Sequence, residues 1–174
     1  KVSQEVLEYM KERIVEPSKK TADYKIIDVS QRSSKWYKLR EGKVTGTTAY
    51  YLKNHSVGYA IKKGNEEEEK NYTNDYMKRG RNLEPIGIAK FSRQKNLNVE
   101  SVGFVDSLLH DTAGFSPDGV IYGDNGEINT IIEHKAFGEK HHFACSERID
   151  DRVMYQIQFG MYVTGAKDAY LVLY

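Results

Sequence analysis

Two periodicities of apolar residues alternate along the chain and predict a mixture of helices and strands. Apolar residues at helical spacing predict helices over 3–16, from 45 or 47 through 52, over 71–94 and over 152–164. Short apolar runs predict strands over 24–29, 99–105, 120–122, 128–135 and 169–174. This order of elements predicts an α/β fold, in which a central mixed β-sheet is flanked by α-helices.

Proline, glycine and charged residues indicate where these elements bend or end. Pro85 falls inside the helix 71–94 and predicts a kink or a break there, because proline lacks the backbone donor. Gly165 follows the last helix as a C-cap, and the turn formers of 123–126 predict a hairpin between two strands. The charge run 63–70 is typical of a solvated loop.

Composition indicates a globular chain and excludes few functions. Of the 174 residues, 39% are hydrophobic and 29% are charged, so we expect a single domain over 1–174, with the helix 3–16 as an appendage. The formal net charge is only +1, so a DNA-binding surface has to be a local patch. Cys145 is the only cysteine, and we find no signal peptide or membrane-spanning apolar run, which favours the cytoplasm and no membrane partner.

Two short fragments carry the candidate chemistry. They are Ser116-Pro117-Asp118-Gly119 and Glu133-His134-Lys135. If the residues between them form a hairpin, Asp118 comes beside Glu133, and Lys135 shares a strand face with Glu133. Two carboxylates can hold a hard divalent cation, which supplies Lewis acidity and a nucleophilic water that Lys135 can orient. The pattern indicates a metal-dependent phosphodiesterase.

Each fragment also has a simpler interpretation. Proline, aspartate and glycine all favour turns, so Asp118 alone would be a turn residue. Glu133 and Lys135 alone could face solvent on an edge strand. Because both follow the apolar run Thr130-Ile131-Ile132, which we expect to be buried, the conjunction favours a functional site.

Three more polar residues lie in helices that are otherwise basic or apolar. Glu84 is the only acid in the basic segment 78–95. It is either an ion-pair partner or a further metal ligand or water-positioning group. Gln156 and Gln158 lie in the helix 152–164, where they are either surface amides or partners of a phosphate or of the attacking water.

Five motifs follow one another from Trp36 to Tyr174. They are Trp36-Tyr37-Lys38-Leu39-Arg40-Glu41-Gly42-Lys43-Val44-Thr45-Gly46-Thr47, Gly80 to Glu84, Ser116 to Gly119, Glu133 to Lys135, and Tyr155 to Gly165. Together and in this order they resemble the lambda exonuclease and YqaJ-like viral recombinase family of the PD-(D/E)xK nuclease superfamily. The resemblance covers most of the chain.

The resemblance implies a Mg²⁺-dependent exonuclease, with Mn²⁺ as a substitute for Mg²⁺. Such an enzyme digests one strand of duplex DNA from a 5′ end and feeds recombination. The resemblance further implies that Asp118, Glu133 and the backbone carbonyl of His134 bind the metal ion. It makes Lys135 the catalytic lysine and Glu84 a support for the metal ion or its water.

The resemblance also assigns residues to the DNA. Gln156 would bind the water or the scissile phosphate, with Gln158 on the same helix as a DNA contact. Arg40 and Thr47 would hold the 5′-terminal phosphate, with Trp36 beside them. A guanidinium fork binds phosphate through two hydrogen bonds, and a helix that begins at Thr47 would add backbone amides.

The expected partners are duplex DNA ends, a single-strand annealing protein and further copies of the chain, which form a ring-shaped trimer in relatives. Two positions depart from the family pattern. Thr47 stands where serine is common, and Ala136-Phe137 lacks the proline that is common two residues after the lysine. The alternative functions are a PD-(D/E)xK endonuclease with the same site and a non-catalytic module that binds DNA ends.

Overall fold

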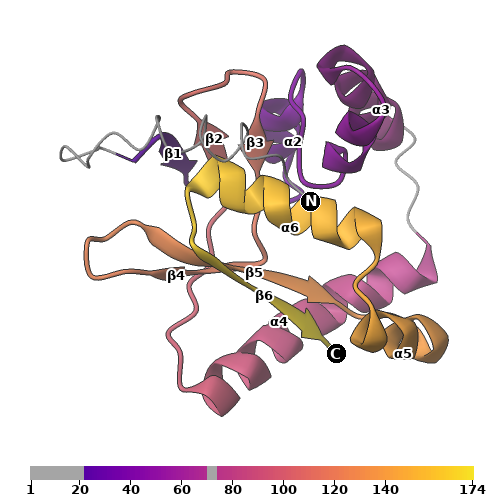
Figure 1. The fold of residues 1–174 in the computed structure, drawn as a ribbon, viewed down its shortest axis with the longest axis vertical. Helices are drawn as coiled ribbons and strands as arrows, with labels where there is room; N and C mark the ends of the chain where they lie inside the picture. Colours follow the sequence, from indigo (N-terminus) through magenta and orange to yellow (C-terminus); the bar gives the residue numbers. More distant parts are fainter. Residues whose placement is uncertain (1–21, 70–73) are drawn as a thin grey trace, which may run out of the picture.

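The structure, a computed structural model, describes residues 22–69 and 74–174, so the helix predicted over 3–16 lies outside the described residues. Two three-stranded sheets and the helices that cover them make up this part of the chain (Figure 1). The predicted α/β class is confirmed, but the strands form two sheets instead of one central sheet. Pro117, which has no backbone donor, separates the last strand of the first sheet from the first strand of the second.

The first sheet is antiparallel and has the order β1-β2-β3. Its strands are β1 (Tyr24–Ile27), β2 (Phe104–Ser107) and β3 (Gly114–Phe115). The strand predicted over 99–105 begins later, because the backbone at Gly103 lies directly against Val29 and leaves no space even for a Cβ. Before β2, Glu100 makes a single bridge to Val120.

The second sheet has the order β4-β5-β6 and carries the candidate chemistry. Strands β4 (Gly119–Tyr122) and β5 (Ile128–Lys135) are antiparallel, and β6 (Asp168–Leu173) runs parallel to β5. The predicted turn is confirmed, since Gly126 has φ +77° and donates its N–H to the Gly123 carbonyl at 2.9 Å. The pairing shifts by one residue between Ile121 and Tyr122, so the turn and this irregularity together fix which residues of β4 and β5 face each other.

Helix α6 (Asp151–Thr164) contacts both sheets, and α4 (Asp75–Lys95) contacts β5 and β6 from the other side (Figure 1). A Cβ on Gly160 of α6 would meet Phe115 and Ile131, so this helix packs closely on both sheets. Both side chains are fully buried in the main core. Burial of one such side chain stabilises the fold by roughly 1.5–3 kcal/mol.

The long helix α4 is continuous through Pro85, so the predicted break is absent. Asn74 caps its start by accepting the N–H of Met77 at 2.8 Å, and Asn96 ends it in the left-handed conformation. Pro85 is exposed, so water can satisfy the carbonyl of Arg81 that loses its donor.

The prediction of a loop for the charge run is wrong over the described residues 63–69, because these residues belong to helix α3 (Val57–Glu69). Ser56 accepts the N–H of Tyr59 at the start of this helix. Within it, Glu66 pairs with Lys63 at 2.7 Å and with Lys62 at 3.9 Å. Glutamate and lysine are good helix formers, and pairs at these spacings add stability.

Besides α3, two helices were not anticipated from the pattern: α2 (Ser34–Arg40) and α5 (Glu139–Glu147). The helix expected from 45 or 47 is a short 3₁₀ helix, η1 (Ala49–Lys53). In residues 22–69 and 74–174 no helix has the length and apolarity to cross a membrane.

Candidate active site

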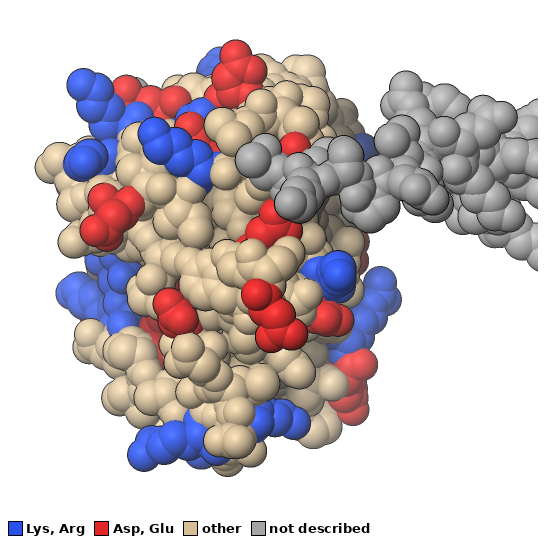
Figure 2. Space-filling view, turned by 90° about the vertical axis from the view of Figure 1, so that its left-hand side faces the viewer, with Lys and Arg blue, Asp and Glu red and all other residues tan. Residues whose placement is uncertain are grey.

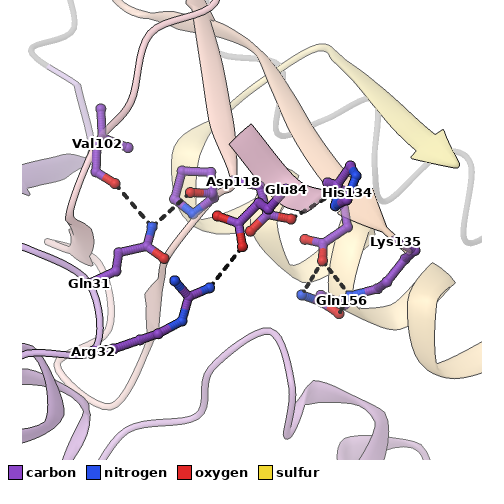
Figure 3. A network of polar contacts seen from close by, with 10 residues as sticks. Gln31, Arg32, Glu84, Val102, Asp118, His134, Lys135 and Gln156 are labelled. Atoms are coloured by element: carbon purple, nitrogen blue, oxygen red, sulfur yellow. Dashed lines mark hydrogen bonds and ion pairs between the residues drawn. The ribbon is translucent and has the colours of Figure 1, made fainter. Parts of the chain in front are cut away.

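The β4–β5 hairpin brings Asp118 beside the end of β5. Gly119 pairs with Ile132 across the hairpin, and Asp118, one residue earlier, donates its N–H to the Ile132 carbonyl at 3.2 Å. The carboxylate of Asp118 accepts the backbone N–H of His134 at 2.7 Å (Figure 3). The register of the sheet therefore positions Asp118.

Glu133, Lys135 and Gln156 form a closed set of hydrogen bonds (Figure 3). Side chains alternate along β5, so Glu133 and Lys135 share the face that looks toward α6, the helix that carries Gln156. Lys135 Nζ lies 2.6 Å from Glu133 Oε1 and 3.1 Å from Gln156 Oε1. Gln156 Nε2 in turn donates to Glu133 Oε1 at 2.7 Å. Each member of this triad, as we call these three residues, orients the other two.

Burial is the main influence on the charges of this site. It raises the pKa of Asp118 well above its usual value, and the charges of Glu133 and Glu84 raise it further. Burial also raises the pKa of Glu133, although the ammonium of Lys135 opposes the shift. For Lys135, burial lowers the pKa, but the charge and hydrogen bond of Glu133 outweigh burial and the pKa is raised. Two carboxylates whose ionisation is unfavourable make a site that a cation would stabilise.

His134 lies on the opposite face of β5 from the triad. Its imidazole packs against Gly87 of α4, where a Cβ would clash with the ring. Burial lowers the pKa of His134, and Nε2 has no hydrogen-bond partner among the described residues. His134 therefore contributes its backbone, and not its ring, to the surroundings of Asp118.

Glu84 of α4 forms an ion pair, one of the two roles expected for it, but with a partner that the sequence did not indicate. Its Oε2 lies 2.8 Å from Arg32 Nη2, and Arg32 precedes α2 (Figure 3). The neighbouring Gln31 donates its side-chain amide to the carbonyls of Val102 at 3.2 Å and Pro117 at 3.0 Å. One short segment therefore ties α4 to the residue before Asp118.

Helix α2 places Trp36 and Arg40 on one face. Ser33 caps the helix by accepting the N–H of Trp36, and the spacing of four residues stacks the Arg40 guanidinium 4.2 Å from the Trp36 ring centre. The indole N–H of Trp36 donates to Ser116 Oγ at 2.9 Å. The position of Arg40 is thus linked to the segment that leads into Asp118.

Thr47 lies beside Arg40, but it does not begin a helix. Arg40 Nη2 approaches Thr47 Oγ1 at 3.5 Å and Thr45 Oγ1 at 3.3 Å. The helix starts only at Ala49, and Thr48 Oγ1 accepts the backbone N–H of Thr45 at 3.0 Å. Such local side-chain bonds compete with helix formation. The expectation of helix amides at Thr47 is therefore wrong.

One open cleft of about 610 Å³ gathers most of the predicted residues. Those that line it are Trp36, Arg40, Thr47, Glu84, Asp118, Glu133, His134, Lys135 and Gln156. Gln158 is not among them: it is exposed on α6, with its amide 4.0 Å from Met154 Sδ.

The oxygen donors of the cleft fit a hard divalent cation that takes few ligands from protein side chains. Within the described ranges, no three His, Cys, Asp or Glu side chains are grouped closely enough to bind a metal ion by themselves. The carboxylate of Glu133 is buried and that of Asp118 is half-buried, and Glu133 Oε2 has no hydrogen-bond partner in this part of the chain. A cation would satisfy that oxygen, with the His134 carbonyl and water completing an all-oxygen shell. Glu84 is already paired with Arg32.

Sequence reasoning missed Gln31, Arg32 and Gly46. A Cβ on Gly46 would lie 2.9 Å from Gln156 Cγ and 2.9 Å from Phe115, so only glycine allows this close approach to the triad. Arg32 has φ +67°, a left-handed conformation that nothing in its sequence surroundings marks. The Ser33 cap and the spacing of Trp36 to Arg40 were signals that could have predicted α2.

Comparison with known proteins decides the family. Residues 35–167 match the model of the YqaJ-like viral recombinase domain, which is more than half of the chain. The chain belongs to the YqaJ-like viral recombinase family. The match includes every predicted site residue and confirms the resemblance seen in the sequence motifs, whereas Gln31 and Arg32 lie before the matched residues.

Solved structures agree with this family on the fold. The chain resembles the alkaline exonuclease LHK-Exo from Laribacter hongkongensis with 24% identity and a TM-score of 0.66, over 82% of this chain and 74% of that one. The structure of LHK-Exo in complex with dAMP matches with the same identity and coverage and a TM-score of 0.67. No curated protein matches the chain. The YqaJ-like domain therefore has the α/β fold of that exonuclease.

Proposed function

We propose that this YqaJ-like domain is a Mg²⁺-dependent deoxyribonuclease that degrades one strand of duplex DNA from a 5′ end during recombination. The observation that carries the proposal is the triad of Glu133, Lys135 and Gln156 beside Asp118. The buried carboxylate of Glu133, the half-buried carboxylate of Asp118, one ammonium and one amide line one cleft. This is the donor set that phosphodiester hydrolysis requires. The family and the fold of the alkaline exonuclease support the same class of activity.

The metal ion would be held by Asp118, Glu133 and the backbone carbonyl of His134. When bound there, Mg²⁺ supplies Lewis acidity at the phosphate and lowers the pKa of a water molecule. Mn²⁺ should substitute, because it accepts similar oxygen ligands. The hydrogen bond from the His134 N–H keeps the Asp118 carboxylate in place for this role.

Lys135 and Gln156 would act on the scissile phosphate and on the attacking water. The ammonium of Lys135 stays protonated, since Glu133 raises its pKa, and it can stabilise the charge that develops on the phosphate. The amide of Gln156 has a fixed orientation because it both donates to Glu133 and accepts from Lys135. Preorganised groups of this kind lower the barrier without reorganising during the reaction.

Arg40, Thr47 and Trp36 would bind the 5′-terminal phosphate. The guanidinium stacks on the Trp36 ring and lies beside the Thr47 hydroxyl at the rim of the same cleft. Stacking fixes the plane of the fork, and the hydroxyl adds a neutral donor. Recognition of the end would therefore come from side chains.

Linear duplex DNA with a 5′-phosphate and a label on each strand tests the activity. With Mg²⁺, the 5′-phosphorylated strand should shorten while its complement persists, and EDTA should stop the reaction. Lys135→Ala should lose the activity, whereas Lys167→Ala, a change of the same type at the opposite end of the sheet, should keep it. A covalently closed circle should remain intact. Cleavage of the circle would indicate the endonuclease instead, and binding of ends without any cleavage would indicate the non-catalytic module.

A further inference from the structure

Arg32 is a non-glycine residue in a glycine-like conformation at the edge of the cleft. Its φ of +67° lies in the left-handed region, which arginine rarely adopts. Strained residues persist only where their surroundings hold them, and they cluster at functional sites. Of the residues 22–69 and 74–174, only Arg32 and the helix C-cap Asn96 combine a side chain with a positive φ. The C-cap accounts for Asn96, whereas Arg32 is the third residue of a turn that the Ser33 N–H closes on the Ser30 carbonyl at 3.2 Å, a position that usually takes glycine or asparagine.

Contacts on both sides hold Arg32 at this position. Gln31 binds the carbonyls of Val102 and Pro117, so the backbone before Arg32 is anchored next to the Asp118 segment. The guanidinium meets Glu84 Oε2 at 2.8 Å and lines the cleft together with Asp118 (Figure 3). The unusual backbone conformation therefore directs the cation of Arg32 into the cleft.

The pair of Arg32 and Glu84 leaves most of the guanidinium available. Among the residues that the structure describes, Arg32 donates only to Glu84, and only through Nη2. An arginine has five N–H donors in a planar fork, and two of them can bind one phosphate. The side chain is 40% exposed, so a ligand in the cleft can reach it.

The acidic residues of the cleft explain why the guanidinium of Arg32 would favour the binding of DNA there. Glu84, Asp118 and Glu133 are three acids lining one cleft, and Glu84 adds to the repulsion that raises the pKa of the other two. A DNA strand brings further negative charge, so a cation beside Glu84 favours its passage, as do Arg81 and Lys135, which line the same cleft. Acidic and basic groups are interspersed on the face in Figure 2 outside the grey atoms.

We propose that Arg32 binds a backbone phosphate of the DNA strand in the cleft, with its guanidinium oriented by Glu84. The role rests on the proposed nuclease function and adds a second phosphate contact to that of Arg40. Arg32 lies two residues before helix α2 and Arg40 is its last residue, and the seven residues of the helix span about 10 Å. Arg32 therefore meets an internal phosphate while Arg40 meets the terminal one.

The salt dependence of DNA binding tests the role. Binding of 5′-phosphorylated duplex is measured with Ca²⁺ in place of Mg²⁺ over a range of salt concentrations. For Arg32→Gly, the slope of log K against log salt should fall by about 0.7–0.9, the value of one lost phosphate contact, and affinity at low salt should fall about tenfold. Glycine suits a φ of +67°, so the variant should fold at least as well as the wild type.

Three matched variants separate phosphate binding from a structural tie. Arg32→Lys should restore the slope because it keeps the charge, and Glu84→Gln should keep the slope because Arg32 remains. Lys167→Ala removes an exposed cation far from the cleft and should change neither slope nor affinity. If Arg32→Gly leaves the slope unchanged, or if Glu84→Gln lowers it as much as Arg32→Gly, then Arg32 only ties the loop to α4 and the proposal is wrong.

Single methylphosphonate linkages locate the phosphate. A neutral linkage at one internal position near the 5′ end should weaken binding of the wild type and leave Arg32→Gly unaffected. The same sensitivity in both proteins overturns the proposal. These binding measurements are independent of cleavage: a wild type that binds in this way but never cuts DNA contradicts the nuclease function alone, and one that cuts with an unchanged Arg32→Gly slope contradicts the role of Arg32 alone.

Discussion

The hairpin β4–β5 and the segment 31–47 build opposite sides of one cleft by different means. In the hairpin, backbone pairing sets the positions of Asp118 and Glu133, and the triad contacts are 2.6–3.1 Å long. In the segment 31–47, Arg40 is held by a ring and by hydroxyls at 3.3–3.5 Å. The triad is closely bonded around the buried Glu133, whereas Arg40 is half-buried and has longer contacts with its hydroxyl partners.

This difference separates chemistry from recognition. Groups that act in a transition state have to be fixed before the substrate arrives, because reorganisation during the reaction costs rate. Groups that bind a flexible DNA end can adapt, so longer and more exposed contacts suffice. Changes in the hairpin should therefore lower the rate on every substrate, whereas changes to Arg40 or to the ring beneath it should alter the choice of DNA end.

The largest effect is expected for Asp118→Asn. Asparagine keeps an oxygen that can accept the His134 N–H, so the hairpin should fold, but the negative charge for the metal ion is lost. The single-turnover rate should fall by about 10²–10³ on both 5′-phosphorylated and 5′-hydroxyl duplex. Asp124→Asn, the same substitution in the exposed turn of the same hairpin, is the control and should cut at the wild-type rate. If Asp118→Asn cuts at the wild-type rate, the hairpin does not carry the catalytic metal site.

The hairpin side of the cleft could be predicted from the sequence because local rules set it. The turn over 123–126 and the apolar run of β5 bring the two strands together, and a one-residue shift between Ile121 and Tyr122, which the sequence did not predict, completes the register that brings Asp118 to Glu133. Alternation then places Lys135 with Glu133. For Gln156 of α6, the residues left a surface amide and a partner of phosphate or water open, and the family resemblance favoured the second; its bonds to Glu133 and Lys135 were not predicted.

The opposite side could be predicted only in part, because it depends on tertiary contacts. The ion pair of Arg32 with Glu84 joins residues 52 positions apart, and neither residue shows this in its own neighbourhood. The helix over 63–69 was missed because the charges were counted and not paired by spacing. The division into two sheets depends on the break at Pro117, which reads as an ordinary turn residue in the sequence.

A smaller and more selective effect is expected for Arg40→Ala. A charge-assisted hydrogen bond contributes about 1.5–3 kcal/mol, so the rate on 5′-phosphorylated ends should fall about 10- to 100-fold. The rate on 5′-hydroxyl ends should stay nearly constant, since the contact is already missing there. Lys38→Ala on the exposed face of the same helix serves as the control and should preserve both rates. Equal losses on both ends would make Arg40 a structural residue and break the comparison.

The next effect is one of stability and depends on pH. The pKa of Asp118 is raised in the folded protein, which means that the folded protein binds the proton of this carboxyl group more tightly than the unfolded chain does. The ionised Asp118 therefore destabilises the fold increasingly as the pH rises above 3.8, the ordinary pKa of an aspartate. In EDTA near pH 7, Asp118→Asn should therefore unfold a few degrees above the wild type, at roughly 2–4 °C per kcal/mol. The difference should shrink as the pH is lowered toward 4. Thermal unfolding at several pH values measures this difference in unfolding temperature. A difference that grows on acidification would mean that the pKa of Asp118 is lowered in the folded protein and not raised.

The smallest effect is expected for Trp36→Phe, which tests how the two sides are joined. Phenylalanine keeps an aromatic platform under Arg40 but removes the indole N–H that donates to Ser116, two residues before Asp118. Loss of one such hydrogen bond costs about 1 kcal/mol, so the rate should fall about fivefold. The loss should be equal on both kinds of DNA end, because it acts through the Asp118 segment and leaves the platform in place. Trp36→Leu removes the platform as well and should also reduce the preference for a 5′-phosphate. If Trp36→Phe reduces that preference as much as Trp36→Leu, the hydrogen bond of the indole is what orients Arg40. The residues that bind the DNA end would then be held as rigidly as the residues that act on the phosphate.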